Sequence, residues 1–379
     1  MNEKLGTIWP LEPHTKAKHE ILRYYLGAWF PILASVYLRL LYVDGFAGPG
    51  EYKGGEDGSP IIALKVARDH ALKHKLTRSG MDLVFLFIEK DEERYQNLQR
   101  KISELKPQLP AAFRIETYHT SFDEVFGVVL SKIEEQNARL APSFVFIDPF
   151  GPTGFPMSLI GHLAQQRRSE VLITFNYQSL NQWFLQDPDK HKYLDELYGS
   201  NVWRQALDIA EPDHKESYLM QTYHKALESL GWKGRPFRMV NKQNQTQYYL
   251  FFATSHPAGM LAMKRAMWNA SPTEEFQYFD SIDPQQQRLF DKELYDEEYS
   301  KGLADQIYQS HRGQRVSKRK LEQTDLAWHS ICVERHLTRA LQILEYEYTP
   351  PRITNIELPH GRIRRKRTYA DDCIITFAP

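Results

Sequence analysis

A cluster of glycines behind an acidic residue is the first chemically suggestive feature. The stretch "YVDGFAGPGEY" places glycines at 45, 48 and 50 directly after an acid at 44. Glycine at a strand end lets a ligand approach the backbone, and the amides that follow supply hydrogen-bond donors. The spacing excludes the G-x-G-x-x-G dinucleotide fingerprint, and no G-x-x-x-x-G-K-[ST] phosphate loop occurs in the chain. The pattern therefore predicts a nucleotide-like ligand, with a plain tight turn as the alternative. The predicted ligand-binding residues are Asp44, Gly45, Phe46, Ala47, Gly48 and Gly50.

Two later strand ends carry residues that could contact the same ligand. Glu89 ends the apolar run "FLFIEKD", where a carboxylate can accept both hydroxyls of a ribose. Ser121 and Asp123 in "HTSFDEV" follow the next strand, where this kind of fold usually contacts adenine. The alternatives are a solvated charge for Glu89 and, for Ser121 with Glu124, a helix capping box.

The candidate catalytic group is Asp148, in "FVFIDPFG". It lies at the carboxyl end of a predicted central strand, in the crevice where open α/β sheets bind ligands. An Asx turn at a strand end is the alternative role for this residue. The residues predicted to carry catalysis are Asp148, Pro149, Phe150 and Gly151.

The basic residues are unevenly distributed, although 48 basic and 48 acidic residues cancel. Two clusters near the C-terminus flank a predicted helix, and two short predicted strands lie close to the second cluster. Helices followed by a basic hairpin indicate a winged helix that contacts phosphates, while a solvated charged face is the alternative. The predicted nucleic-acid-binding residues are Arg312, Arg315, Lys318, Arg319, Arg362, Arg364, Arg365, Lys366 and Arg367.

Composition limits the other classes of function. Only Cys332 and Cys373 are present, which excludes a disulfide framework or a cysteine-based metal centre within this chain. His14 and His19 do not share a helical face, so we expect no metal. The N-terminus lacks a signal-peptide core and no long apolar run occurs, so we expect a cytoplasmic protein that does not enter a membrane.

Strand and helix patterns alternate through the first half of the chain. Apolar strands are predicted over 38–45, 81–91, 113–120, 143–151 and 169–177, with helices over 92–105, 122–136 and 157–166. A helix over 15–37, interrupted by Pro31, precedes them. Residues 236–255 predict two strands joined by a polar turn at 242–245. The role of the polar segment 178–217 stays open.

These patterns predict a Rossmann-like α/β domain, with a mostly parallel sheet closed by an antiparallel hairpin. Composition shifts near Pro272. We therefore predict two domains: 1–272, with its N-terminal helix, and a basic, winged-helix-like α+β domain over 273–379.

The motif "DGFAGPG" resembles the first motif of class I S-adenosylmethionine-dependent methyltransferases, in the form found in enzymes that methylate exocyclic amines of nucleobases. In those enzymes the position of Asp148 belongs to [DN]-P-P-[YF]. There the polar side chain and a backbone carbonyl accept hydrogen bonds from the amine, and the aromatic ring stacks on the base. The form D-P-F-G departs from this pattern, although it occurs in tRNA N2,N2-dimethylguanosine methyltransferases. The candidates for the stacking ring are Phe150, Phe155 and Tyr177.

A broader resemblance is to the three-Cys-motif partner proteins, a bacterial family with a methyltransferase-like fold. It is carried by "PHTKAKHEILRYYLGAW", "YVDGFAGPG", "GSPIIAL", "FLFIEKD", "FIDPFG" and "FNY". It implies a co-encoded protein bearing the cysteine motif as a partner. The helix containing Lys16, Lys18 and His19 is also similar to one in bacterial ribosomal-RNA adenine methyltransferases, which implies a lid over the cofactor.

Three hypotheses follow. The chain is a methyltransferase that uses S-adenosylmethionine to modify an exocyclic amine of RNA or DNA. Alternatively, it is a non-catalytic adaptor with the same fold that binds nucleic acid and serves the three-Cys-motif partner. A small-molecule methyltransferase is the third hypothesis, and it predicts that the basic tail is dispensable.

Overall fold

The computed structural model describes residues 6–166, 168–241, 243–270, 277–279, 291–359 and 362–379. The chain forms two compact units: unit 1 comprises 1–255 and 277–280, and unit 2 comprises 256–276 and 281–379. The predicted boundary at 272 and the predicted turn residue 242 lie outside the described residues. The helix ending at Ala270 belongs to unit 2, and the strand at 277–279 belongs to unit 1.

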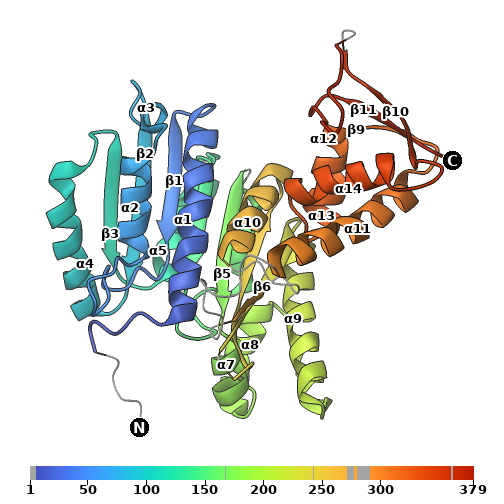
Figure 1. The fold of residues 1–379 in the computed structure, drawn as a ribbon. Coiled ribbons are helices and arrows are strands. Elements are labelled where there is room, and N and C mark those ends of the chain that lie inside the picture. Colours follow the sequence, from blue (N-terminus) through green and yellow to red (C-terminus); the bar gives the residue numbers. More distant parts are fainter. Residues whose placement is uncertain (1–5, 167, 242, 271–276, 280–290, 360–361) are drawn as a thin grey trace. The chain divides into compact units, whose positions relative to one another are not determined.

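Unit 1 alternates strands and helices along most of its length (Figure 1). Its strands are β1 Arg39–Asp44, β2 Asp82–Glu89, β3 Phe113–His119, β4 Ser143–Ile147, β5 Ser169–Phe175, β6 Lys233–Val240, β7 Thr246–Thr254 and β8 Gln277–Phe279. Its α-helices are α1 Pro13–Ala34, α2 Ser59–Asp69, α3 Lys73–Leu76, α4 Glu92–Leu105, α5 Phe122–Glu135, α6 Met157–Gln165, α7 Tyr177–Ser179, α8 His191–Tyr198 and α9 Pro212–Ser229. These bounds confirm the predicted strands and helices to within a few residues.

The eight strands form one sheet in the order β3-β2-β1-β4-β5-β7-β6-β8. Strands β1 to β5 run parallel to one another, and β7 is antiparallel to both β5 and β6. This is a Rossmann-like α/β arrangement, with the predicted antiparallel closing hairpin. The strand order reverses between β1 and β4, which is where open α/β sheets place ligands.

Helices cover both faces of this sheet, which explains why its strands are almost continuously apolar. On one face, aromatic side chains of β2 and β4 pack against α1, with ring centroids of Phe30 and Phe85 5.9 Å apart and those of Tyr25 and Phe144 4.8 Å apart. On the other face, alternate residues of the same strands join a core with α5 and α6 that includes Ile147. Rigid packing on both sides fixes where each strand ends.

The strand register brings the three predicted acids to one edge. Asp44, the last residue of β1, pairs with Phe87 of β2 and with Phe146 of β4. Glu89 and Asp148 each lie two residues beyond these partners. Because parallel strands end at the same edge, the acids of β1, β2 and β4 surround the point where the strand order reverses.

The predicted interruption of the first helix at Pro31 is wrong. Helix α1 continues through Pro31 to Ala34. Proline removes one backbone donor and crowds the preceding turn, which usually kinks or ends a helix. Here most of the helix, including the buried Tyr25 and Phe30, packs against the sheet, and this tertiary packing outweighs the local preference.

The segment 178–217 packs onto unit 1 and is not a separate element. It contains α8 and short helical turns, and its large side chains Tyr198 and Trp203 are fully buried in the core. Gln178, at its start, reaches the cavity described below. The segment therefore extends the core of unit 1 beyond β5, and its first residue lies at the cavity.

Unit 2 is an α+β unit with a small antiparallel sheet. Its elements are α10 Pro257–Ala270, α11 Asp291–His311, β9 Arg315–Ser317, α12 Lys318–Leu321, α13 Ala327–His329, α14 Glu334–Tyr346, β10 Ile353–Glu357 and β11 Ile374–Phe377. The sheet has the order β10-β11-β9. A core that includes Leu303, Leu341 and Ile375 holds the helices against this sheet.

Candidate active site

A cavity of about 580 Å³ lies at the carboxyl edge of the sheet, where the predicted acids meet. This volume is within the range of pockets that hold cofactors and drug-sized ligands. Three parts of unit 1 line it: the N-terminal segment with the start of α1, the loops after β1 and β4, and residues of β5 and β7. The lining includes Trp9, His14, Lys18, Phe46, Ala47, Gly48, Pro49, Gly50, Glu51, Tyr52, Ser59, Asp148, Pro149, Phe150, Thr174, Asn176 and Tyr248.

The glycines of the first loop have different physical roles. A Cβ at Gly45 would lie 2.7 Å from the Phe122 ring, so this position is small because a helix packs on it. A Cβ at Gly50 would lie 3.1 Å from Leu98, again a packing constraint. Gly48 has a φ of +63° and no atom within 4 Å of an added Cβ. Gly48 is therefore the glycine that leaves open space beside the cavity.

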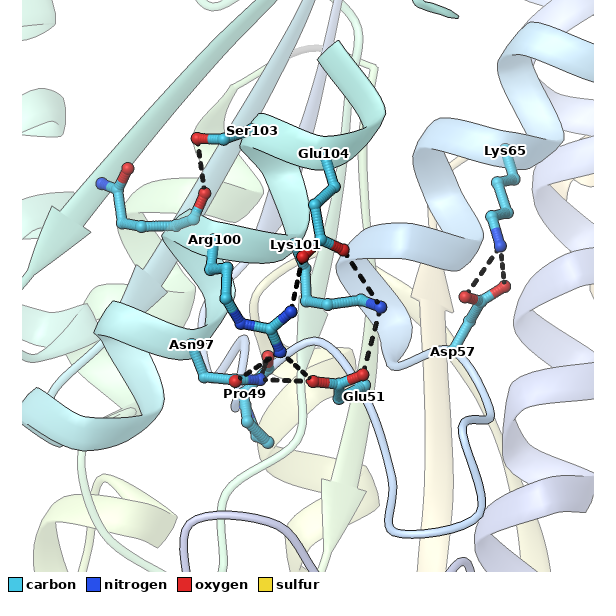
Figure 2. Close-up of polar contacts among 10 residues, drawn as sticks. Pro49, Glu51, Asp57, Lys65, Asn97, Arg100, Lys101, Ser103 and Glu104 are labelled. Carbon is cyan, nitrogen blue, oxygen red and sulfur yellow. Dashed lines mark hydrogen bonds and ion pairs between the residues drawn. The ribbon is translucent and has the colours of Figure 1, made fainter.

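A network of charges anchors this loop to helix α4 (Figure 2). Asn97 donates a 2.8 Å hydrogen bond to the Pro49 carbonyl and a 3.1 Å bond to the Glu51 carboxylate. Arg100 donates to the same carboxylate, and Lys101 Nζ lies 3.1 Å from it. Burial raises the pKa of Glu51, but the hydrogen bonds from Asn97 and Lys101 outweigh it, so the net shift is downward. Glu51 therefore stays ionised and fixes the loop to the helix.

Asp44 is fully buried beneath the loop and only partly satisfied. Its Oδ1 accepts a long 3.4 Å hydrogen bond from the Phe46 amide, while Oδ2 has no hydrogen-bond partner among the described residues. Burial is the main reason why the pKa of Asp44 rises to about 7; a polar contact with the Ser59 side chain opposes the rise, and the charges of Asp148 and Glu89 add to it. An unsatisfied buried carboxyl is costly, so this oxygen suits a cationic or hydrogen-bonding ligand group.

Glu89 is held by the loops on either side of it. Its carboxylate accepts 2.8 Å hydrogen bonds from the amides of Gly48 and Asp91. Each carboxylate oxygen retains a further lone pair for a ligand hydroxyl. Glu89 is buried and lies beneath the residues that line the cavity.

Asp148 forms an ion pair that the sequence did not reveal. Both of its carboxylate oxygens lie 2.6 Å from Nζ of Lys18, which comes from α1. Only 7% of the Lys18 side chain is exposed, against 21% for Asp148. The ammonium also lies 5.0 Å from the ring centroid of Tyr248 on β7. Asp148 is thus the more accessible member of a buried pair, with lone pairs free to accept hydrogen bonds from a substrate.

His19, beside Lys18 in the sequence, is a neutral packing residue. Burial, together with the neighbouring Lys18 charge, lowers its pKa to about 3. Its ring lies edge-on to the Tyr52 ring, with centroids 5.5 Å apart. It therefore carries no charge near neutral pH.

The structure separates the predicted stacking candidates. Phe150 lines the cavity with 54% of its surface exposed, whereas Phe155 and Tyr177 are buried in the core of unit 1. Asn176 donates a 3.0 Å hydrogen bond to the Phe150 carbonyl and so connects the ends of β4 and β5. Three further aromatic residues, which the sequence did not indicate as site residues, also line the cavity: Trp9, Tyr52 and Tyr248.

Other predicted residues lie away from the cavity lining. Ser121 and Asp123 are at the start of α5, where the Ser121 amide donates a 3.4 Å bond to Glu124 in keeping with a capping role. Gly151 follows Phe150 in the same loop and is also outside the lining. Their predicted roles stay predictions.

The basic residues of the two predicted clusters fall into three groups. Several are held by acids of the same unit: Arg315 by Glu357, Lys318 by Glu322 and Asp371, Arg362 by Asp372, and Arg364 by Glu345. Arg312 and Arg367 lie over the rings of Tyr308 and Tyr346. Within the described part of unit 2, the exposed side chains of Arg319, Lys320, Arg365 and Lys366 form no ion pair.

Solved structures similar to this chain are methyltransferases. A putative caffeoyl-CoA O-methyltransferase from Staphylococcus aureus is 10% identical, with 57% of this chain and 75% of that chain covered and a TM-score of 0.27. Magnesium protoporphyrin IX methyltransferase from Synechocystis PCC 6803, with bound SAH, is 14% identical, with 64% and 86% covered and a TM-score of 0.32. These similarities are too low to carry an inference about activity. No family model and no curated protein matches this chain.

Within the described residues, no helix is both long enough and apolar enough to cross a membrane.

Proposed function

We propose that this chain is an S-adenosylmethionine-dependent methyltransferase that modifies an exocyclic amine of a nucleic-acid base. The observation that carries the proposal is that Asp148 and the glycine loop around Gly48 line the same cavity. An acceptor for an amine and the space for a cofactor are therefore adjacent, at the point where the strand order reverses.

The residues present fit S-adenosylmethionine. Gly48 leaves space at the loop, Glu89 offers acceptors for ribose hydroxyls, and the unsatisfied Oδ2 of Asp44 suits the ammonium of the methionine portion. When bound, the cofactor supplies a methyl group on a positively charged sulfur. The contribution of the protein is then alignment, because such a methyl group needs no strong base.

Asp148 is the residue that would align the substrate. Its carboxylate can accept hydrogen bonds from an exocyclic amine, while Lys18 keeps the carboxylate in place and balances its charge. The amine nitrogen donates its N–H bonds to the acceptor and directs its lone pair toward the methyl group. After transfer, the extra proton on nitrogen passes to solvent or to a nearby acceptor.

Unit 2 supplies the argument for nucleic acid. The element order α11, β9, α12 to α14, β10 and β11, with β11 between the other two strands, is compatible with a winged-helix-like module. Arg365 and Lys366 lie in the connection between β10 and β11, the position of a wing. Together with Arg319 and Lys320 they offer exposed positive charge to phosphates.

The direct test is methyl transfer from labelled S-adenosylmethionine to pooled RNA and DNA, followed by mass spectrometry of the nucleosides. We expect a methyl group on an exocyclic amine. Absence of transfer to any base, by a protein that binds the cofactor, would refute the proposal. Transfer to a small molecule instead would favour the third hypothesis, and the basic residues of unit 2 would then be dispensable.

A second candidate is a non-catalytic adaptor that serves a co-encoded three-Cys-motif protein. The observation that favours it is the ion pair in which Lys18 contacts both oxygens of Asp148, since such a pair could equally be structural. Co-purification with the encoded neighbour would support the adaptor. A chain that binds neither that neighbour nor nucleic acid would exclude it.

The Glu51 network predicts a moderate effect on cofactor affinity. Glu51→Gln removes the charge that Arg100 and Lys101 bind, which loosens the loop, so we expect about 3- to 10-fold weaker binding of S-adenosylmethionine. Calorimetric titration measures this effect. Glu104→Gln is the matched control, because Glu104 contacts the same two cations without touching the loop. Equal affinities of the two variants would contradict the anchoring role.

Asp44 predicts a dependence of stability on pH. Because its pKa rises from 3.8 unfolded to about 7 folded, the native state binds more protons in this range, and stability is lost as pH rises through it. Asp44→Asn should therefore increase the melting temperature of the ligand-free protein more at pH 8 than at pH 5. In wild type, affinity for S-adenosylmethionine should rise about 5- to 10-fold from pH 6 to 8 as the carboxylate forms. If the melting temperature of Asp44→Asn and its affinity for S-adenosylmethionine depend on pH as they do in wild type, Asp44 is not the group that titrates.

A further inference from the structure

Two aromatic rings and one arginine form a cluster at the cavity, drawn from three separate parts of unit 1. Trp9 belongs to the segment before α1, Phe150 to the loop after β4, and Arg94 to the first turn of α4. The ring centroids of Trp9 and Phe150 are 5.6 Å apart, at an interplanar angle of 68°. The Arg94 guanidinium carbon lies 5.0 Å from the Trp9 ring centroid and 4.8 Å from that of Phe150.

Arg94 is an unusual arginine in this helix. Arg100, two turns along α4, is held by Glu51 and Glu104. Across the described residues, in contrast, the Arg94 side chain forms no ion pair and no hydrogen bond, while its backbone amide donates a 3.0 Å hydrogen bond to Asp91. A guanidinium has five N–H donors arranged to bind an oxyanion in a bidentate manner. Arg94 therefore offers unused donors next to two aromatic faces.

We propose that Trp9, Phe150 and Arg94 form a nucleotide-binding slot that receives the target nucleotide. The base stacks on the half-exposed Phe150 ring with the Trp9 indole beside it, and Arg94 binds an adjacent phosphate. This inference rests on the proposed function and adds the site on unit 1 that recognises the substrate. It also accounts for the D-P-F-G sequence, because the aromatic surface absent after Phe150 is provided by Trp9, from a distant part of the chain.

The chemistry of the cluster favours a nucleotide over a ring without phosphate. Base–aromatic stacking does not depend on which base is bound, since every base has a π face. An arginine without an acidic partner adds a charge-assisted contact that only an anionic ligand can use. The cavity continues from Phe150 to Asp148, so a stacked base can present its exocyclic amine to the carboxylate.

The competing explanation is that Trp9 only attaches the N-terminal segment to the body of unit 1. The Trp9 carbonyl accepts a 2.9 Å hydrogen bond from the Lys53 amide, and Thr7 donates a 2.6 Å bond to Glu93. These bonds do not require an aromatic side chain or a positive charge at 94. If Trp9 has only this attachment role, substitutions at 9 and 94 should change the thermal stability, but they should not change the affinity for nucleotides or its dependence on salt.

The test is binding of a fluorescein-labelled, mixed-sequence single-stranded 12-mer, RNA or DNA, to the full chain at several salt concentrations. Trp9→Ala should weaken binding about 5- to 100-fold, and Trp9→Phe should restore most of it. Arg94→Gln should weaken binding and reduce the slope of log affinity against log salt by about one. Trp183→Ala and Arg114→Gln are controls, because these residues lie outside the cavity and are 62% and 53% exposed.

The outcomes separate the slot from the proposed function. If wild type transfers methyl groups to nucleic acid and the variants at 9 and 94 keep the wild-type affinity and KM, the slot is refuted while the function stands. If the variants lose affinity as expected but wild type methylates no base, the function is refuted while the slot stands. Variants that change only the melting temperature support mere attachment and overturn the inference.

Discussion

Replacing Gly48 with leucine is expected to abolish detectable binding of S-adenosylmethionine. An added Cβ at this position meets no protein atom within 4 Å, so the rest of a leucine side chain extends into the space beside the cavity. A ligand that approaches the backbone here would overlap with it. We expect a loss of affinity of about 100-fold or more, which calorimetric titration would show as the disappearance of the binding signal.

Backbone strain must be separated from this steric effect. Gly48 has a φ of +63°, and a side chain in this conformation costs on the order of 1–2 kcal/mol. Gly55 is the matched control: its φ is +86°, an added Cβ also meets nothing within 4 Å, and it does not line the cavity. Gly48→Leu and Gly55→Leu should lose similar stability in thermal unfolding. Only the variant at 48 should lose the ligand, and equal binding by both would show that Gly48 serves the turn alone.

The sequence was sufficient to predict the parallel sheet and the positions of its acids. Continuous apolar runs such as those ending at Asp44 and Glu89 are typical of parallel strands that are covered on both faces, and the register of such strands places their ends together. The carboxylates of β1, β2 and β4 could therefore be located from one-dimensional spacing. This holds because each of them ends, or directly follows, the strand that positions it.

The partners of these residues could not be predicted from the sequence, because they come from distant segments of the chain. Lys18 is 130 residues from Asp148 in the sequence, and Trp9 (position 9) is 141 residues from Phe150 (position 150). The pattern of α1 does not identify the acid that pairs with Lys18. It does indicate that Lys18 is directed inward, because Lys18 lies on the same helical face as the apolar Leu22 and Tyr25, where a charge requires a partner.

Runs of basic residues are the second feature whose role the sequence does not determine. The spacing of basic residues in 312–320 and 362–367 predicts a stripe, but it does not say which charges are already neutralised by acids of the same unit. Lys318 forms an ion pair with Glu322, and Arg364 forms one with Glu345. Arg365 and Lys366, in contrast, are exposed. Local sequence encodes charge, whereas the tertiary fold determines which charges remain available to a ligand.

Removing the carboxylate at 148 should produce the largest loss of catalysis. Asp148→Ala removes both acceptor oxygens of the side chain, so the substrate amine is no longer aligned with the methyl group. We expect the rate of methyl transfer to fall by about 100-fold or more, with S-adenosylmethionine affinity within about 3-fold of wild type. A single-turnover assay and calorimetry measure the two quantities. Retained activity would refute the catalytic assignment.

Loss of the ion pair with Lys18 could inactivate the variant by destabilising the fold. A double substitution tests this explanation. Asp148→Ala leaves the ammonium of Lys18 buried without its counter-charge, which should cost about 2–3 kcal/mol of folding free energy, given that Asp148 is partly exposed. Lys18→Met combined with Asp148→Ala removes both charges and should recover most of that stability in thermal unfolding. If Asp148 touches the substrate, the double variant stays inactive despite its recovered stability. Recovery of activity together with stability would mean that the pair only supports the fold, and it would favour the adaptor.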